Sequence, residues 1–237
     1  SKREEIEKLL EDLKRDNKRV LDRLREVIKD NEDKNEKAVR DARELLERLK
    51  RELEEGNLDE RLRDVVRRLL TELEEILKEL EETLKRNNDE VRKLVDELRK
   101  TSRENLEKLR ELVEKVREGT SDKTIRDAKR ESEKKLEDIK KRIKEVEDKS
   151  RKTVEDIRRR IKEVDDKLRR TLEEVRRRDG DTEALKRLEE VAKELLKLIE
   201  EVLKENERSN REILRLIAEL VKRNARVNEE LLEIARR

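Results

Sequence analysis

The sequence predicts an all-α fold: an antiparallel up-down-up-down bundle of four long, nearly straight helices. Of its 237 residues, 57% are charged and none is proline, so the segments contain no strong helix breaker. Apolar residues recur every 18 residues, which is five turns of a helix with 3.6 residues per turn. Gly56, Gly119 and Gly180 divide the chain into four segments of similar length. Because the connections at these glycines are short, consecutive helices should be antiparallel neighbours.

We expect helices over about residues 2–55, 58–118, 121–178 and 182–236, in a single bundle domain that covers 1–237. Each glycine follows a charged helical run, as a glycine at the C′ position of a helix does. Residues suited to capping begin every segment: Ser1 with Glu4, Asn57 with Glu60, then Thr120, Ser121 and Asp122, and finally Asp181 and Thr182.

The third segment shows the repeat most clearly. Its blocks IRDAKRESEKKLEDIKKR, IKEVEDKSRKTVEDIRRR and IKEVDDKLRRTLEEVRRR begin at Ile125, Ile143 and Ile161. A strict heptad repeat would impose a left-handed supercoil, whereas the longer period predicts helices that hardly twist around one another. The same spacing relates Leu10, Ile28 and Leu46 in the first segment, Leu58, Ile76, Leu94 and Leu112 in the second, and Leu185, Leu203 and Val221 in the fourth.

The fourth segment carries an additional apolar stripe, formed by Leu198, Leu216 and Ile234. Either this helix is the most enclosed of the four, or the stripe meets another chain. An exposed apolar seam of this length would favour association. The sequence therefore leaves both a monomer and a homo-oligomer open.

Polar residues replace apolar ones at some predicted core positions, and they repeat with the same period. Counted along antiparallel helices, they fall into two layers, one near the middle of the bundle and one toward the end that carries the N-terminus. The apolar members of the same series fall together toward the other end: Leu53, Leu69, Leu168, Leu188 and Ala192. We expect a buried polar network formed by Asn17, Asn31, Asn35, Asn87, Asn88, Ser102, Asn105, Ser132, Ser150, Asn206, Ser209, Asn210, Asn224 and Asn228.

Buried amides restrict which helices can pair and in which register. An unpaired buried amide costs about 1–3 kcal/mol, whereas a paired one is nearly neutral. Displaced helices would set unpaired amides against leucine, so the layers favour one arrangement. An amide-lined ligand or ion site is the less favoured interpretation, because no ionisable group accompanies the amides at the predicted core positions.

The composition excludes most chemistry. The chain has no His, Cys, Met or aromatic residue, and therefore no histidine base, thiolate nucleophile or stacking platform. No carboxylate is expected to point inward, and no glycine-rich phosphate loop is present. We expect no enzymatic activity, no catalytic or metal-binding residue, no cofactor and no small-molecule ligand. No transmembrane or targeting segment is found, so no cellular location is predicted. We expect recombinant expression in the cytoplasm.

Residues 121–178 hold 23 basic and 16 acidic residues, with basic clusters at 140–142, 158–160 and 176–178. One interpretation is a stripe that binds nucleic-acid phosphates or acidic lipids. We favour a repeated surface pattern whose charge is offset by acidic neighbours. Neither nucleic acid nor a membrane is therefore expected as a partner.

These features resemble de novo designed helical bundles, which combine ideal caps, Glu/Lys/Arg surfaces and buried Asn/Ser hydrogen-bond networks. The segment 120–132, TSDKTIRDAKRES, is similar to the loop and helix pieces of designed network-bearing oligomers. The alternation of polar and apolar layers is similar to designed four-helix heterodimers, here joined into one chain. The resemblance covers the whole chain, but it rests on the overall manner of construction and not on a catalytic motif. The absence of Trp and Tyr is a departure, since designed bundles often include one of them for detection.

The resemblance implies a structural scaffold with no natural biochemical activity, in which the buried polar layers specify helix pairing. The alternative is a binding or self-assembly module. It would use the extra apolar stripe of the fourth helix or the basic stripe of the third. The burial of Leu198, Leu216 and Ile234 within one chain would distinguish the two.

Overall fold

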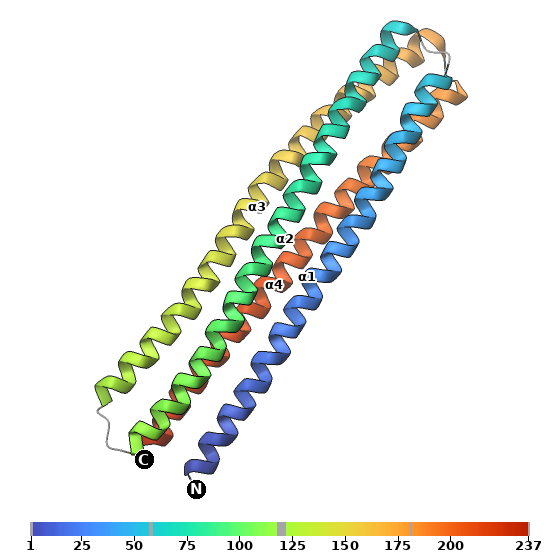
Figure 1. The fold of residues 1–237 in the computed structure, drawn as a ribbon. Coiled ribbons are helices and arrows are strands. Elements are labelled where there is room, and N and C mark those ends of the chain that lie inside the picture. The colour runs from blue at the N-terminus through green and yellow to red at the C-terminus, as the bar shows by residue number, and fades with distance from the viewer. Residues whose placement is uncertain (1, 57–58, 118–121, 181, 237) are drawn as a thin grey trace. The chain divides into compact units, whose positions relative to one another are not determined.

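The protein is a four-helix bundle. The computed structural model describes residues 2–56, 59–117, 122–180 and 182–236, and contains no strand among them. The helices are α1 (Lys2–Glu55), α2 (Glu60–Arg117), α3 (Asp122–Asp179) and α4 (Glu183–Arg236), as Figure 1 shows. The predicted fold class is confirmed. The amphipathic 18-residue pattern explains it, since each helix must bury its apolar stripe against the others.

The connection between α3 and α4 follows the predicted glycine chemistry. Gly180 has a φ of 79°, and its N–H donates to the Arg176 carbonyl oxygen at 3.0 Å. This is the left-handed geometry in which glycine ends a helix. The Thr182 hydroxyl oxygen then accepts a bond from the Leu185 N–H at 3.3 Å and caps α4.

The connection between α1 and α2 differs from the prediction in two respects. Gly56 follows α1, but its φ is not positive. Asp59, which the sequence analysis did not single out, accepts a bond from the Arg61 N–H at 3.3 Å ahead of α2. The predicted capping residues Ser1, Asn57, Thr120, Ser121 and Asp181, together with Gly119, lie outside the described residues.

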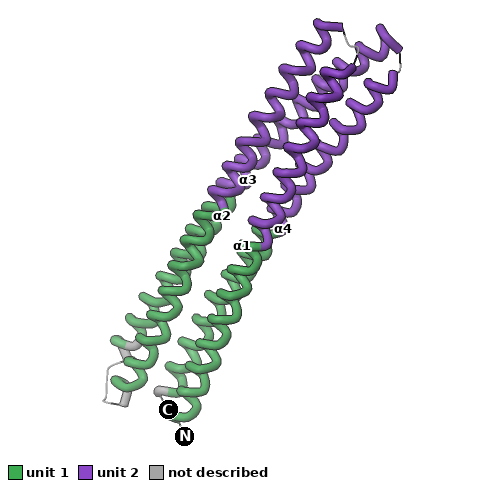
Figure 2. Tube along the Cα trace, turned by 45° about the vertical axis from the view of Figure 1, so that its right-hand side comes forward, with its two compact units in different colours: residues 1–29, 88–148, 209–237 green, residues 30–87, 149–208 purple. Residues whose placement is uncertain are grey.

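The chain divides into two compact units, coloured separately in Figure 2. Unit 1 comprises residues 1–29, 88–148 and 209–237, and unit 2 comprises residues 30–87 and 149–208. Every helix contributes one part to each unit. A single domain over the whole chain stays a prediction.

Within unit 1 the helices form a ring in chain order. Ion pairs join α1 to α2 (Arg110–Glu11, 3.3 Å), α2 to α3 (Arg142–Glu97, 2.7 Å), α3 to α4 (Lys129–Glu229, 3.5 Å) and α4 to α1 (Arg223–Asp16, 2.9 Å). Unit 2 has the same ring. Its pairs are Lys50–Glu74 at 2.9 Å, Arg160–Glu79, Arg158–Glu207 at 2.7 Å and Lys34–Glu205 at 3.1 Å. Residue numbers rise on one partner helix as they fall on the next, so neighbours are antiparallel.

Among the described residues, the apolar core consists of three clusters. The largest lies in unit 2 and contains all five residues of the predicted apolar layer, Leu53, Leu69, Leu168, Leu188 and Ala192. That prediction is confirmed. Unit 1 holds the other two clusters, which we call the inner cluster, including Leu24, Val91, Ile143 and Ile213, and the end cluster, including Leu13, Leu109 and Leu231.

Candidate functional site

A layer of buried amides separates the inner cluster from the end cluster in unit 1. On α1, Asn17 lies between Leu13 of the end cluster and Val20 of the inner cluster. On α4, Asn224 lies between Val221 and Val227 in the same way. The layer, which we call the asparagine layer, consists of Asn17, Ser102, Asn105, Ser132, Asn224 and Asn228, and all six side chains are buried.

Asn224 on α4 is the centre of the asparagine layer. Its Nδ2 donates to Asn17 Oδ1 at 2.8 Å, and Asn17 Nδ2 donates back to Asn224 Oδ1 at 3.4 Å. Asn105 Nδ2 on α2 donates to the same Asn224 oxygen at 3.3 Å and to Asn228 Oδ1 at 3.4 Å. Amides from α1, α2 and α4 are therefore bonded to one another. The bond from α2 to α4 crosses the ring rather than joining neighbours.

The bonds in the asparagine layer do not use every polar atom. Asn105 Oδ1 and Asn228 Nδ2 are buried without a hydrogen-bond partner in the protein. The Ser102 hydroxyl donates to the Arg99 carbonyl oxygen of its own helix at 2.9 Å. A partly satisfied layer stabilises the fold less than a complete one.

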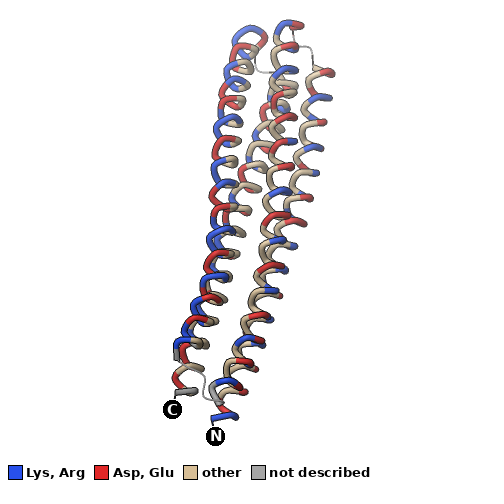
Figure 3. Tube along the Cα trace, turned by 60° about the vertical axis from the view of Figure 1, so that its left-hand side comes forward, with Lys and Arg blue, Asp and Glu red and all other residues tan. Residues whose placement is uncertain are grey.

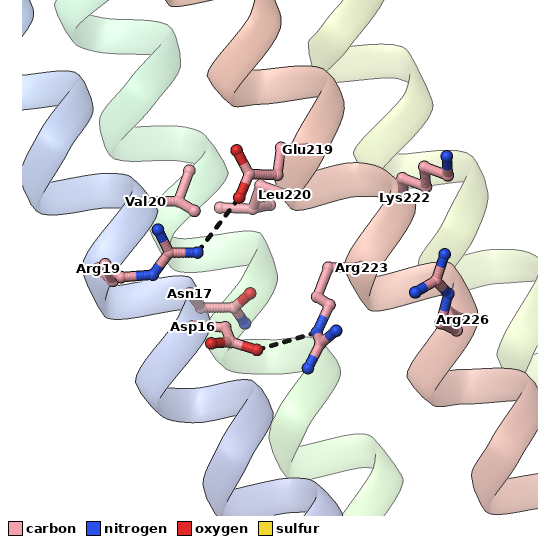
Figure 4. Close-up of a pocket in the computed structure, with 9 residues that line it drawn as sticks. All are labelled: Asp16, Asn17, Arg19, Val20, Glu219, Leu220, Lys222, Arg223 and Arg226. Carbon is pink, nitrogen blue, oxygen red and sulfur yellow. Dashed lines mark hydrogen bonds and ion pairs between the residues drawn. The ribbon is translucent and has the colours of Figure 1, made fainter.

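A surface groove of about 280 Å³ runs along the α1–α4 edge of the asparagine layer (Figure 4). Asn17 forms part of its wall, and two ion pairs join its sides: Arg19 with Glu219 at 3.2 Å and Arg223 with Asp16 at 2.9 Å. These pairs neutralise both carboxylates that line the groove. Hydroxyl, thiol and imidazole groups are absent from the lining.

The remaining predicted network residues are divided between the units. Asn31, Asn35, Asn87, Ser150 and Asn206 belong to unit 2, and Asn88, Ser209 and Asn210 belong to unit 1. All are buried except Asn210, which is half-buried. Asn35 Nδ2 donates to Asn31 Oδ1 at 3.0 Å, within one helix. Both amide atoms of Asn87 and the Ser150 hydroxyl are buried without a partner in the protein. A network through these residues stays a prediction.

One expectation about the core is wrong. The sequence predicts no inward carboxylate, but Glu147 on α3 is only 4% exposed and neither carboxylate oxygen has a hydrogen-bond partner. Burial, and to a lesser extent the charge of Asp148, raises the pKa of Glu147 to about 8. The position could have been found from the sequence, since it follows Ile143 by four residues and precedes Ser150 by three. Both spacings place it on the buried face.

The basic clusters of α3 are mostly paired with acidic residues, and Figure 3 shows both signs along the helices. Within α3 itself, Arg159 forms an ion pair with Asp156 at 3.2 Å, and Arg176 forms one with Glu173 at 3.0 Å. Pairs to the neighbouring helices are Arg142 with Glu97, Arg158 with Glu200 and Glu207, Arg160 with Glu79, Arg176 with Glu189, and Arg178 with Asp59.

The additional stripe of α4 faces the core. Leu216 and Ile234 are buried in the inner and end clusters, and Leu198 is half-buried against the cluster of unit 2. Among the described residues, the one large apolar side chain that counts as exposed is Val65, at 39%. The stripe therefore offers no exposed apolar seam.

The described residues contain no group of three or more Asp or Glu side chains placed to hold a metal ion. Across the same residues, no helix has a stretch apolar and long enough to cross a membrane.

No family model matches the sequence, and no curated protein is similar to it. Among solved structures, the chain is similar to one described as a "Computationally designed three helix bundle". The match covers 97% of this chain and 90% of that one, at 22% identity and a TM-score of 0.25. With so low a TM-score, this similarity carries no argument about fold or function.

Proposed function

We propose that this chain is a designed structural scaffold without enzymatic activity, in which buried asparagine and serine layers specify how its helices pair. The observation that carries the proposal is the asparagine layer of unit 1. There, Asn224 bonds to Asn17 on one helix and to Asn105 on another. A cluster of amides that bond mainly to one another, with no ionisable partner, suits specification of pairing rather than catalysis.

Composition supports a designed origin. The chain lacks eight residue types, and 57% of its residues are charged. Natural globular chains have roughly 25% charged residues. Designed helices are usually built from Leu, Ile, Val, Glu, Lys and Arg, with glycine and capping residues kept for their ends. Gly180 directly follows α3 and Thr182 directly precedes α4, in agreement with that practice.

The asparagine layer acts on register because apolar residues flank it. A slip of α1 by one turn would set Leu13 or Val20 opposite Asn224 in place of Asn17. Both amides of the broken pair would then be buried against apolar groups, at about 1–3 kcal/mol for each unpaired group. Correct register is favoured by this penalty more than by the strength of the bonds themselves.

The alternative, a binding or self-assembly module, has less support. Leu216 and Ile234 are buried within one chain, and the arginines of α3 are largely engaged by acidic residues. Neither stripe is therefore free to recruit a partner in the way that interpretation requires. We accordingly propose a monomer.

The test replaces the four asparagines of the asparagine layer with leucine in the full chain, as Asn17→Leu, Asn105→Leu, Asn224→Leu and Asn228→Leu together. Size-exclusion chromatography with light scattering is run across a wide concentration range. For the original protein we expect a single mass near 28.8 kDa. The leucine variant should remain helical but show mixed masses, because several registers and chain pairings become nearly equivalent.

A matched control exchanges apolar residues in the inner cluster without adding or removing polar groups: Leu24→Ile, Leu98→Ile, Ile143→Leu and Ile217→Leu. It tests the effect of four core substitutions alone, and it should keep a single mass. If the leucine variant is as uniform and monomeric as this control, the layer does not specify pairing and the proposal is wrong.

A further inference from the structure

Glu147 lies on the side of α3 that meets α4 in unit 1. It follows Lys129 by 18 residues, or five helical turns, so the two share one face of α3. Lys129 bonds to Glu229 on α4 at 3.5 Å. Because the helices are antiparallel, the α4 residue level with Glu147 lies 18 positions before Glu229. That residue is Arg211, and Asn210 immediately precedes it.

The same relation recurs one repeat further along α3, within unit 2. Asp165 follows Glu147 by 18 residues, and Ala192 and Lys193 precede Asn210 and Arg211 by 18. Asp165, Ala192 and Lys193 line one groove between α3 and α4. An independent set of contacts therefore supports the pairing of this α3 position with these two positions of α4.

Apolar core residues lie close to the level of Glu147 on three helices. Ile143, one turn earlier on α3, is fully buried, as are Val91 on α2 and Ile213 on α4, and all three belong to the inner cluster. Both oxygens of Glu147 are buried without a partner. Asn210 Oδ1 is also buried without a partner. A protonated carboxyl is a hydrogen-bond donor, so it could satisfy this acceptor, whereas a carboxylate could not.

The charged groups around this position lie at the surface. On α3 itself, Asp148 follows directly and Lys144 is exposed. On α4, Arg211 is exposed at the level of Glu147. Counting from Arg142–Glu97 and Arg25–Asp96, the residues at this level on α2 and α1 are Arg92 and Lys29, both exposed.

We propose that Glu147 is a pH-responsive position in the α3–α4 interface of unit 1, with two side-chain placements. The protonated side chain stays buried and donates to Asn210 Oδ1. The ionised side chain releases its proton to solvent and turns outward to the guanidinium of Arg211. In the structure the Glu147 side chain is buried, as in the first placement. The pKa of Glu147, raised to about 8 by burial, puts the change of placement near neutral pH.

The direct test is carboxyl-carbon NMR of the full-length protein across a pH titration. The Glu147 signal is assigned by its loss in the neutral variant Glu147→Gln. We expect a midpoint at about 8, well above the ordinary glutamate value of 4.5. A Glu147 midpoint close to the ordinary value of 4.5 would show that the carboxyl is not held inside, and would overturn the proposal.

Two further variants test the placements. Arg211→Gln removes the partner of the outward form, so it should raise the Glu147 midpoint by about half a unit or more. Asn210→Leu removes the acceptor of the buried form and should lower the midpoint. Lys222→Gln, a cation lost elsewhere on α4, is the control and should leave it unchanged. If Arg211→Gln moves the midpoint no more than the control does, the outward placement is wrong.

Discussion

Replacing Asn224 alone should be more damaging than replacing it together with its partner. The substitution Asn224→Leu removes both bonds of the Asn17–Asn224 pair and leaves the Asn17 amide buried with neither a donor nor an acceptor opposite it. Asn105 keeps its bond to Asn228 at 3.4 Å. The loss of hydrogen bonds therefore affects mainly the Asn17 amide.

The magnitude follows from these two orphaned groups. Each unpaired buried polar group costs about 1–3 kcal/mol, which gives about 2–6 kcal/mol for the Asn17 amide. The buried leucine side chain returns about 1–2 kcal/mol of apolar transfer free energy. We expect Asn224→Leu to lower the free energy of unfolding by about 1–4 kcal/mol.

In the double variant Asn17→Leu/Asn224→Leu no amide of this pair remains, so most of the loss should be recovered. Guanidinium chloride unfolding, followed by far-UV circular dichroism, would measure the single variants, the double variant and their interaction energy. The reasoning is refuted if Asn224→Leu is nearly neutral, or if the double variant is less stable than Asn224→Leu alone.

Three further predictions concern other features. Between the ordinary pKa of 4.5 and about 8, unfolded chains lose the Glu147 proton while folded chains keep it, so stability should fall as pH rises. The total loss in the free energy of unfolding is on the order of 4–5 kcal/mol at most. In the Glu147→Gln variant, the free energy of unfolding should depend less on pH over this range. Gly180→Ala should lower stability by about 1–2 kcal/mol, measured by thermal unfolding, because its φ is 79° although no atom obstructs a Cβ. Arg158→Ala, which breaks pairs to Glu200 and Glu207, should cost at most about 1 kcal/mol, and the difference should shrink in high salt.

Much of the fold could be predicted because the sequence repeats one physical rule. Residues 18 apart occupy the same face of a helix, so the apolar series identified the core of every helix. Polar residues in those series, such as Asn17 and Asn224, were identified in the same way, and both are buried. Loop chemistry predicted the helix end at Gly180 for an equally local reason.

Which helices the buried amides join could not be predicted from the sequence. Spacing alone did not indicate that Asn105 bonds across the ring to Asn224, since both neighbours and diagonal helices lie at the same height. Glu147 was missed for a different reason. A glutamate among so many surface glutamates is assigned to solvent by its type, although its spacing from Ile143 places it on the buried face.

The position of the asparagine layer has a consequence for local opening. Beyond it, the end cluster of unit 1 is the smallest of the three, with eight buried residues among those that the structure describes. When a helix end of unit 1 frays, the contacts of this small cluster break first. Fraying then extends to the amides of the asparagine layer, which can form hydrogen bonds to water as well as to one another. Opening that stops there exposes little further apolar surface, so hydrogen exchange should proceed in two steps. Backbone amides of the end cluster should exchange well before those of the inner cluster, and the asparagine layer should mark the boundary between them.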